Sequence, residues 1–174
     1  MEYHSNQFIA YSPFVLLSTY SKSGAPDCSP RGGSPGFVKV INKNCIVIPD
    51  SKGNNRLDTM LNVVETGKVG CLFLIPGVKE TLRVNGKARI TTQTEYLALF
   101  SGDKNPPKAC IEISVKEVFL HCAKSLMRSK LWSPDSVIAR DTLPTLGSMV
   151  NDQLGIKEVP ESQEAMEARY QQDL

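Results

Sequence analysis

Residues 69–90, VGCLFLIPGVKETLRVNGKARI, contain two runs of β-forming residues joined by a turn. The runs are 69–75 and 81–90, and the PGVKE segment between them has the Pro and Gly that are typical of turns. In the second run, apolar residues alternate with polar ones, which predicts a strand with one buried face and one polar face. Both predicted strands are long enough to cross a small barrel.

Similar short runs lie on both sides of this stretch. Residues 14–19 end in a turn, SKSGAPD, and residues 36–41 and 45–48 form a second predicted hairpin around NKN. Residues 111–120 are the last predicted strand, with Ile111, Ile113, Val115 and Val118 facing inward after a small shift in register. Many short strands and few helical periods predict a mainly β protein with added helices.

The clearest predicted helix is RLDTMLNVVETG, residues 56–67. Four apolar residues recur at helical spacing and predict one core-facing stripe: Leu57, Met60, Leu61 and Val64. Asn55, followed three residues later by Asp58, predicts the N-terminal cap, and Gly67 predicts the end of the helix. A short helix is expected near 92–100, capped by Thr92 or Thr94, whereas 123–132 fit a helix or an ordered loop. The rest of the chain is expected to be helical.

Composition limits the classes of function. With 174 residues, 41% hydrophobic and 22% charged, the chain is expected to form one domain, with a core over about 8–155 and a polar helical tail over 156–174. A net charge of +2 argues against a nucleic-acid binder. Five cysteines without C-x-x-C spacing predict neither a disulfide framework nor a metal site. No export signal or membrane span is visible, so we expect a cytoplasmic protein.

Three basic, glycine- or serine-containing blocks are candidates for binding an anion: SPRGG at 29–33, DSKGNNR at 50–56 and HCAKSLMRSKLW at 121–132. DSKGNNR is the best candidate, because it precedes a helix whose free N–H groups favour a phosphate and because Arg56 adds a charged fork. The spacings of the P-loop and of GxGxxG are absent. The structural alternatives are a solvated turn for Lys52 and Arg56, a surface arginine for Arg31, and a core or interface anchor for Trp132.

In this order, the segments SPRG, PDSKGNNR, VGCLFLIPG, ETLRVNGKARI and FLHCAKSLMRSKLW closely resemble the pyridoxamine 5′-phosphate oxidase-related, FMN-dependent proteins. The chain is most similar to their subgroup with a His-Cys-Ala-Lys block, over about residues 8–155. The resemblance implies an antiparallel, six-stranded split β-barrel in which SPRG is a turn. It also implies a homodimer with two FMN molecules in grooves at the subunit interface.

The resemblance also implies which residues bind FMN. Gly53, Asn54, Asn55 and Arg56 fall where relatives bind the phosphate, and Pro49 and Asp50 end the strand along the flavin. The resemblance further implies that Arg31 is an earlier basic contact and that Thr81 is a polar contact to the edge of the ring. Lys124, Ser125 and Arg128 are implied to come from the other subunit or to close over the phosphate. Trp132 is implied to be a wall of the ring site.

We therefore expect an FMN-dependent oxidoreductase that acts on a small molecule, with NAD(P)H as a possible donor. No catalytic residue is assigned, because the flavin supplies the electron chemistry. The family's C-terminal tryptophan-to-arginine substrate segment is missing, so the resemblance does not extend to oxidation of pyridoxamine 5′-phosphate. The alternatives are a non-enzymatic flavin- or haem-binding storage or stress protein on the same barrel, and use of a deazaflavin in place of FMN.

Overall fold

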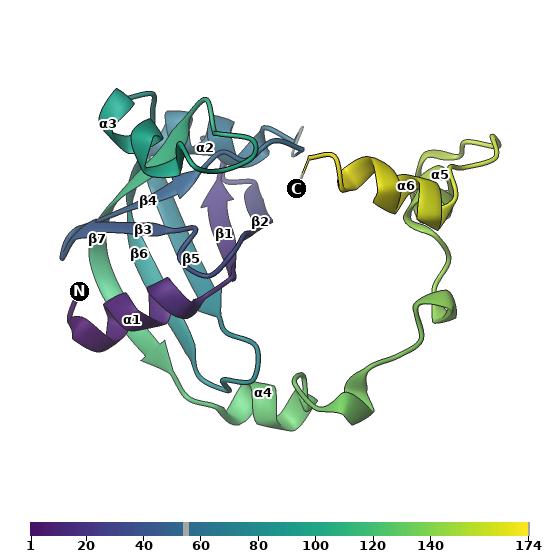
Figure 1. The fold of residues 1–174 in the computed structure, drawn as a ribbon, viewed down its shortest axis with the longest axis horizontal. Coiled ribbons are helices and arrows are strands. Elements are labelled where there is room, and N and C mark those ends of the chain that lie inside the picture. Colours follow the sequence, from purple (N-terminus) through teal and green to yellow (C-terminus); the bar gives the residue numbers. More distant parts are fainter. Residues whose placement is uncertain (54–55, 174) are drawn as a thin grey trace. The chain divides into compact units, whose positions relative to one another are not determined.

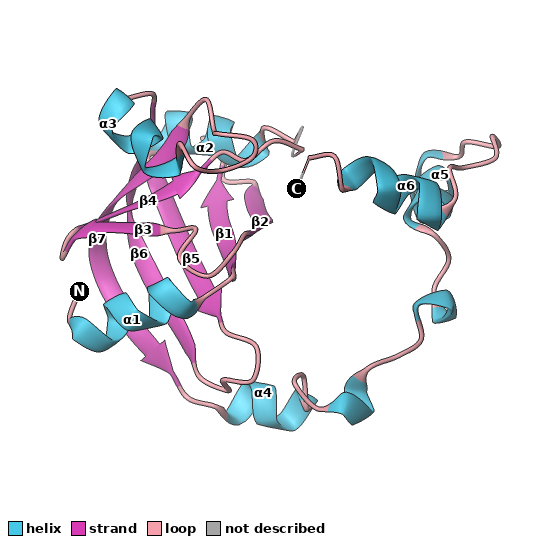
Figure 2. Cartoon of the chain, viewed as in Figure 1, coloured by secondary structure: helices cyan, strands magenta, loops and turns pink. Residues whose placement is uncertain are grey.

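The computed structural model describes residues 1–53 and 56–173, and the chain divides into two compact units, Met1–Trp132 and Ser133–Leu174. The first unit holds the β-sheet and the second holds short helices (Figures 1 and 2). The expectation of a single domain over 1–174 stays a prediction.

The first unit is built on one antiparallel sheet of seven strands in the order β2-β1-β5-β6-β7-β4-β3 (Figure 1). The strands are β1 (Phe14–Tyr20), β2 (Pro26–Gly32), β3 (Lys39–Asn42), β4 (Cys45–Pro49), β5 (Lys68–Leu74), β6 (Thr81–Thr91) and β7 (Cys110–His121). β2 and β3 are the two edges of this sheet, which is not closed. The predicted barrel with added helices is confirmed, with seven strands in place of six.

The additional strand is β2. The SPRG segment was expected to be a turn, but it lies in a strand that pairs with β1 from Phe14↔Gly32 to Tyr20↔Pro26. Proline lacks the N–H that a residue in a central strand needs for its hydrogen bonds. Because β2 is an edge strand, it tolerates Pro26 and Pro30.

The sheet curves around a single main core. As predicted, the alternation along β6 buries Leu82, Val84 and Ala88. The predicted register shift in β7 is also confirmed, because Gly86 pairs with Val115 whereas Asn85 pairs with Glu117. Lys116 is therefore the extra residue of a β-bulge.

Two helices cover the barrel. α1 (Tyr3–Tyr11), which the sequence analysis did not predict, is capped by Glu2 and buries Ile9 completely. α2 (Asp58–Thr66) ends at Gly67 in the left-handed conformation, with φ of 61°, as predicted. Its N-terminal residue is preceded by Leu57, which makes no side-chain cap bond. The predicted cap, Asn55, lies outside the described residues.

The predicted core-facing stripe of α2 is wrong. Leu57, Leu61 and Val64 are 56%, 59% and 72% exposed, and the helix buries Thr59, Asn62 and Val63 instead, while Met60 is half-buried. The polar residues turn inward because they bind the side chains of Asp27 and Thr19 on β2 and β1. An apolar face of α2 is thus left at the surface.

The other helices are short. α3 (Thr94–Leu97) continues into η1 (Ala98–Phe100), and its cap position is Gln93 rather than Thr92 or Thr94. α4 (Lys124–Ser129) confirms the helical alternative for 123–132. The second unit contains η2 (Pro134–Ser136), η3 (Arg140–Thr142), α5 (Leu146–Leu154) and α6 (Gln163–Tyr170). Within the described ranges, no helix is both long and apolar enough to cross a membrane.

Candidate functional site

A cleft of about 660 Å³ lies between β2 and the segment that follows β4. It is lined by Asp27, Cys28, Ser29, Pro30, Arg31, Gly32, Phe37, Pro49, Ser51, Lys52, Gly53 and Arg56. Four of the predicted site residues therefore meet here: Arg31, Pro49, Gly53 and Arg56. The cleft joins two of the three basic blocks that are far apart in the sequence.

Arg31 is the buried cation of this cleft, with only 8% of the residue exposed. Its Nη1 donates to the carbonyl oxygen of Pro30 at 2.9 Å, whereas its buried Nη2 has no hydrogen-bond partner among the described residues. Burial lowers the pKa of Arg31, and the nearby carboxylates of Asp50 and Asp27 oppose this effect. A buried donor without a partner is costly, so the geometry favours an anion in the cleft.

Asp27 fixes the wall that carries Arg31. Its Oδ2 accepts hydrogen bonds from the Thr19 hydroxyl at 3.1 Å and from the Thr59 hydroxyl at 2.7 Å. The Ser29 hydroxyl donates to both oxygens of the same carboxylate, at 3.2 and 3.3 Å. The Asn62 amide donates to Thr19 at 3.0 Å. This network ties β1, β2 and α2 together beside the guanidinium.

Sequence reasoning missed Asp27, although a signal was present. In a strand, residues two apart lie on the same face, so Asp27, Ser29 and Arg31 share one face of β2. That alternation is informative only if the segment is interpreted as a strand, and its two prolines argued for a turn.

The segment after β4 forms the opposite wall. Pro49 is buried and pairs with Cys110, and the Asp50 N–H donates to the carbonyl oxygen of Ala109 at 3.0 Å. Gly53 has φ of 104°, a conformation that side-chain-bearing residues rarely adopt. The Arg56 side chain is 86% exposed, and its Nε contacts Asp58 Oδ2 at 3.1 Å. The predicted phosphate contacts Asn54 and Asn55 lie outside the described residues.

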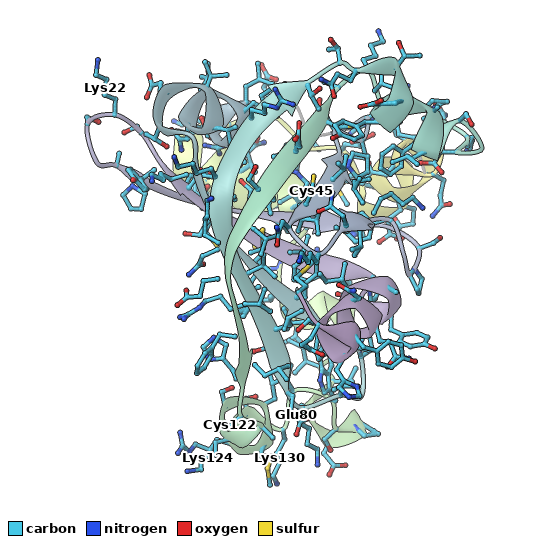
Figure 3. The ribbon with its side chains drawn as sticks, turned by 90° about the vertical axis from the view of Figure 1, so that its left-hand side faces the viewer. Lys22, Cys45, Glu80, Cys122, Lys124 and Lys130 are labelled. Atoms are coloured by element: carbon cyan, nitrogen blue, oxygen red, sulfur yellow. The ribbon has the colours of Figure 1, made fainter. Side chains whose placement is uncertain are left out.

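Five further predicted residues lie at or beyond the end of β6 that is far from Pro49: Thr81, Lys124, Ser125, Arg128 and Trp132. Thr81 pairs with His121, whereas Thr91, at the far end of β6, pairs with Cys110 beside Pro49. The 11 residues of β6 separate Thr81 from Thr91 by roughly 30 Å. Arg31, on the other wall of the cleft, is level with Leu82 through the paired residues Val15 and Phe73. Figure 3 shows Lys124 near Glu80 and Cys122 at one end of the barrel, with Lys22 at the other.

Within this second group, the side chains have different environments. Thr81 is buried, whereas Lys124, Ser125 and Arg128 are exposed on α4. Trp132 is half-buried, and its Nε1 donates to the carbonyl oxygen of Val78 at 2.8 Å. None of these five residues is among those that line the cleft of the same protomer.

Comparisons with known proteins agree with this fold. Solved structures similar to the chain include HupZ from Group A Streptococcus, with 18% identity and a TM-score of 0.58, covering 69% of this chain and 93% of that one. A putative pyridoxamine 5′-phosphate oxidase from Lactobacillus delbrueckii has 16% identity and a TM-score of 0.52, covering 68% and 93%. An F420 reductase has 14% identity and a TM-score of 0.50, covering 68% and 98%. No curated protein sequence matches the chain.

At these identities the solved structures establish the fold alone. The model of the pyridoxamine 5′-phosphate oxidase family matches residues 1–122, which is more than half of the chain and includes the whole sheet. The chain therefore belongs to the pyridoxamine 5′-phosphate oxidase family.

Proposed function

We propose that the protein is an FMN-dependent oxidoreductase that acts on a small molecule as a cytoplasmic homodimer. The observation that carries this proposal is the buried guanidinium of Arg31, whose Nη2 has no partner among the described residues. A phosphate monoester would supply the acceptor, and such charge-assisted bonds are among the stronger ones in proteins. Membership of a family named for an oxidase supports the oxidoreductase class.

The residues of the cleft fit the phosphate end of FMN. Arg31 would donate from the buried side, and Arg56 and Lys52 would add positive charge from the rim. Asp27 would hold β2 in place, so that Arg31 stays aimed into the cleft. Pro49, at the end of β4, would lie along the flavin. When bound, the flavin would supply hydride and electron transfer.

The second group of predicted residues would come from the partner subunit. Lys124, Ser125 and Arg128 do not line the cleft of their own protomer. A two-subunit site removes this conflict, with Thr81 and Trp132 then beside the flavin ring of the other protomer. The exposed apolar face of α2 also supports association, since such faces are commonly buried between subunits.

The first test is the spectrum and stoichiometry of the purified protein. We expect a yellow protein with about one FMN per chain, reduced by NAD(P)H and reoxidised by an acceptor. A colourless protein that micromolar FMN does not reconstitute would refute the proposal. FMN that never turns over would leave a storage or sensor protein, and a deazaflavin spectrum would change the cofactor.

The second test separates a shared site from a single-chain site. One variant carries Arg31→Met and the other carries Lys124→Ala with Arg128→Ala. In a shared site, a dimer of the two variants has one site with both defects and one intact site. After subunit exchange at equal amounts, about a quarter of all sites should regain FMN affinity. If mixing restores no affinity, the two groups do not share a site.

A further inference from the structure

The segment 133–173 has defined helices but no core of its own. None of its described residues is buried. α5 is nevertheless well bounded, because the Thr145 hydroxyl accepts from the Ser148 N–H at 3.2 Å and Gly155 ends the helix in the left-handed conformation. α5 already contacts the following segment, because the Asn151 amide donates to the Glu158 carbonyl oxygen at 2.8 Å. Isolated helices of nine residues are marginal in water, so a further surface would stabilise α5.

α5 presents a continuous apolar stripe to such a surface. Leu146, Val150 and Leu154 are spaced by four residues and therefore lie along one side of the helix. They are 42%, 38% and 67% exposed. The stripe is available for docking.

The charge of this segment is opposite to that of the barrel. Residues 133–174 contain three basic and eight acidic residues, a net charge of −5, which leaves 17 basic and 10 acidic residues, a net charge of +7, in residues 1–132. The overall charge of +2 hides this asymmetry. Opposite charges of this size favour association of the segment with a barrel surface.

The outer face of the sheet offers a groove of about 670 Å³ with the opposite charge and with one exposed aromatic ring, that of Tyr20. Its lining includes Ser18 and Tyr20 from β1, Val69 from β5, and three lysines. Lys68 and Lys87 stand directly opposite each other across β5 and β6, and the bulge residue Lys116 completes the cluster. Like charges opposite each other are unfavourable in a sheet, and an acidic partner would relieve this repulsion.

We propose that α5 of one copy of this chain docks in the groove of a second copy. The apolar stripe would contact the ring of Tyr20, which is 44% exposed, and the acidic residues around α5 would face Lys68, Lys87 and Lys116. The inference rests on the proposed dimer, in which α4 lies at the cleft of the partner subunit. The segment continues from α4 through Trp132, so it begins on the partner.

The groove lies within reach of that starting point. Ser18 in the groove pairs with Cys28 at the rim of the cleft, on the opposite face of the β1–β2 pair from Arg31. A segment that begins at the cleft therefore has to pass only around the edge strand β2 to reach the groove. The 13 residues from 133 to 145, which precede α5, span at most about 45 Å when extended. Once α4 lies at the cleft of the partner, residues 133–145 are therefore long enough for α5 to reach the groove of that partner.

The experiment uses dimers of ¹⁴N- and ¹⁵N-labelled full-length chains, formed by subunit exchange and treated with a zero-length carbodiimide cross-linker. The reagent joins carboxylates to lysines that contact them. We expect mixed-isotope peptides that link residues 152–173 to Lys68, Lys87 or Lys116. Links between these sites within one isotope only would place the segment on its own barrel and would overturn the proposal, as would no links at all.

Two variants and two matched controls test the chemistry of the contact. Val150→Asp interrupts the stripe, and Lys116→Glu reverses a groove charge, so each should lower the yield of mixed cross-links to Lys68 and Lys87 by about tenfold. Val159→Asp, at a side chain that is 95% exposed and outside α5, and Lys108→Glu, on the loop before β7, should leave the yield unchanged. Equal losses in the controls would show that no specific groove contact exists.

Sedimentation and bound FMN, measured on the same samples, separate this inference from the proposed function. A stable dimer with about one FMN per chain, but without mixed cross-links, refutes the α5 contact and leaves the cofactor site intact. A monomer refutes the dimer itself, and the docking proposal is then refuted with it.

Discussion

Replacing Arg31 with Met should weaken FMN binding by about one to two powers of ten. The change keeps a long apolar stem in the buried position but removes the guanidinium, including the Nη2 that lacks a partner among the described residues. Hydrogen bonds to a charged group contribute roughly 1.5–3 kcal/mol, which gives this range of affinity. Riboflavin has no phosphate, so its affinity should change much less.

Arg56→Ala is the matched comparison in the same cleft. Its side chain is 86% exposed and already contacts Asp58, so solvent screens its attraction for an anion. We expect a loss of FMN affinity of less than about fivefold. The structure therefore predicts a larger loss of FMN affinity for Arg31→Met than for Arg56→Ala, whereas the sequence alone pointed to Arg56.

Flavin fluorescence quenching measures both ligands on both variants and on the wild type. Circular dichroism and urea unfolding of the apoprotein show whether each variant is folded. Folding of Arg31→Met is expected, because Asp27 still accepts hydrogen bonds from Thr19, Thr59 and Ser29. An equal loss for riboflavin and FMN, or a larger loss in Arg56→Ala, would refute the phosphate role of Arg31.

Sedimentation of the FMN-loaded protein should give about twice 19.1 kDa, and a monomer with one tightly bound FMN would rule out the two-subunit site. Gly53→Ala should lower FMN affinity by about tenfold, because φ is 104° at this position in the cleft. The control Gly24→Ala, at φ of 88° in the β1–β2 turn, should leave FMN affinity unchanged. Equal losses of affinity in the two variants would exclude a local effect of Gly53. Burial raises the pKa of the Cys71 thiol from its ordinary value of 9.0 to about 12, so the folded state disfavours the thiolate. The free energy of unfolding should therefore fall as pH rises from about 9 toward about 12, where only the unfolded chain ionises this thiol. Over this interval, the free energy of unfolding of the wild type should fall by about 1.4 kcal/mol per pH unit more than that of Cys71→Ala in urea titrations; parallel slopes would contradict the assignment.

The fold was predictable where one face of an element packs against the core. Alternation in β6 placed Leu82, Val84 and Ala88 correctly, because a strand has only two faces. The α2 stripe failed for the opposite reason. A helix can bury polar residues when partners satisfy them, and the partners of Thr59 and Asn62 lie on strands more than 30 residues away in the sequence.

The site was predictable only in part, for a related reason. The DSKGNNR motif is local, so its position before a helix could be read directly from the sequence. Burial of Arg31 depends on the pairing of β2 with β1, and prolines in β2 argued against any strand. The local motif therefore favoured the exposed Arg56, although the buried arginine is the stronger candidate.

The length of β6 connects the cofactor site to the oligomeric state. The resemblance implies that Thr81 and Pro49 both lie beside the flavin, yet the strand register places these two residues at opposite ends of β6. Roughly 30 Å along β6 separates Thr81 from the residues beside Pro49, so one chain cannot supply both the Pro49 half and the Thr81 half of a single flavin site. If both halves bind FMN, the protein must associate, and two equivalent sites follow from two-fold symmetry. Loss of FMN on dilution to the monomer would be the direct consequence, and a monomer that retained full affinity would show that only the Arg31 half binds the cofactor.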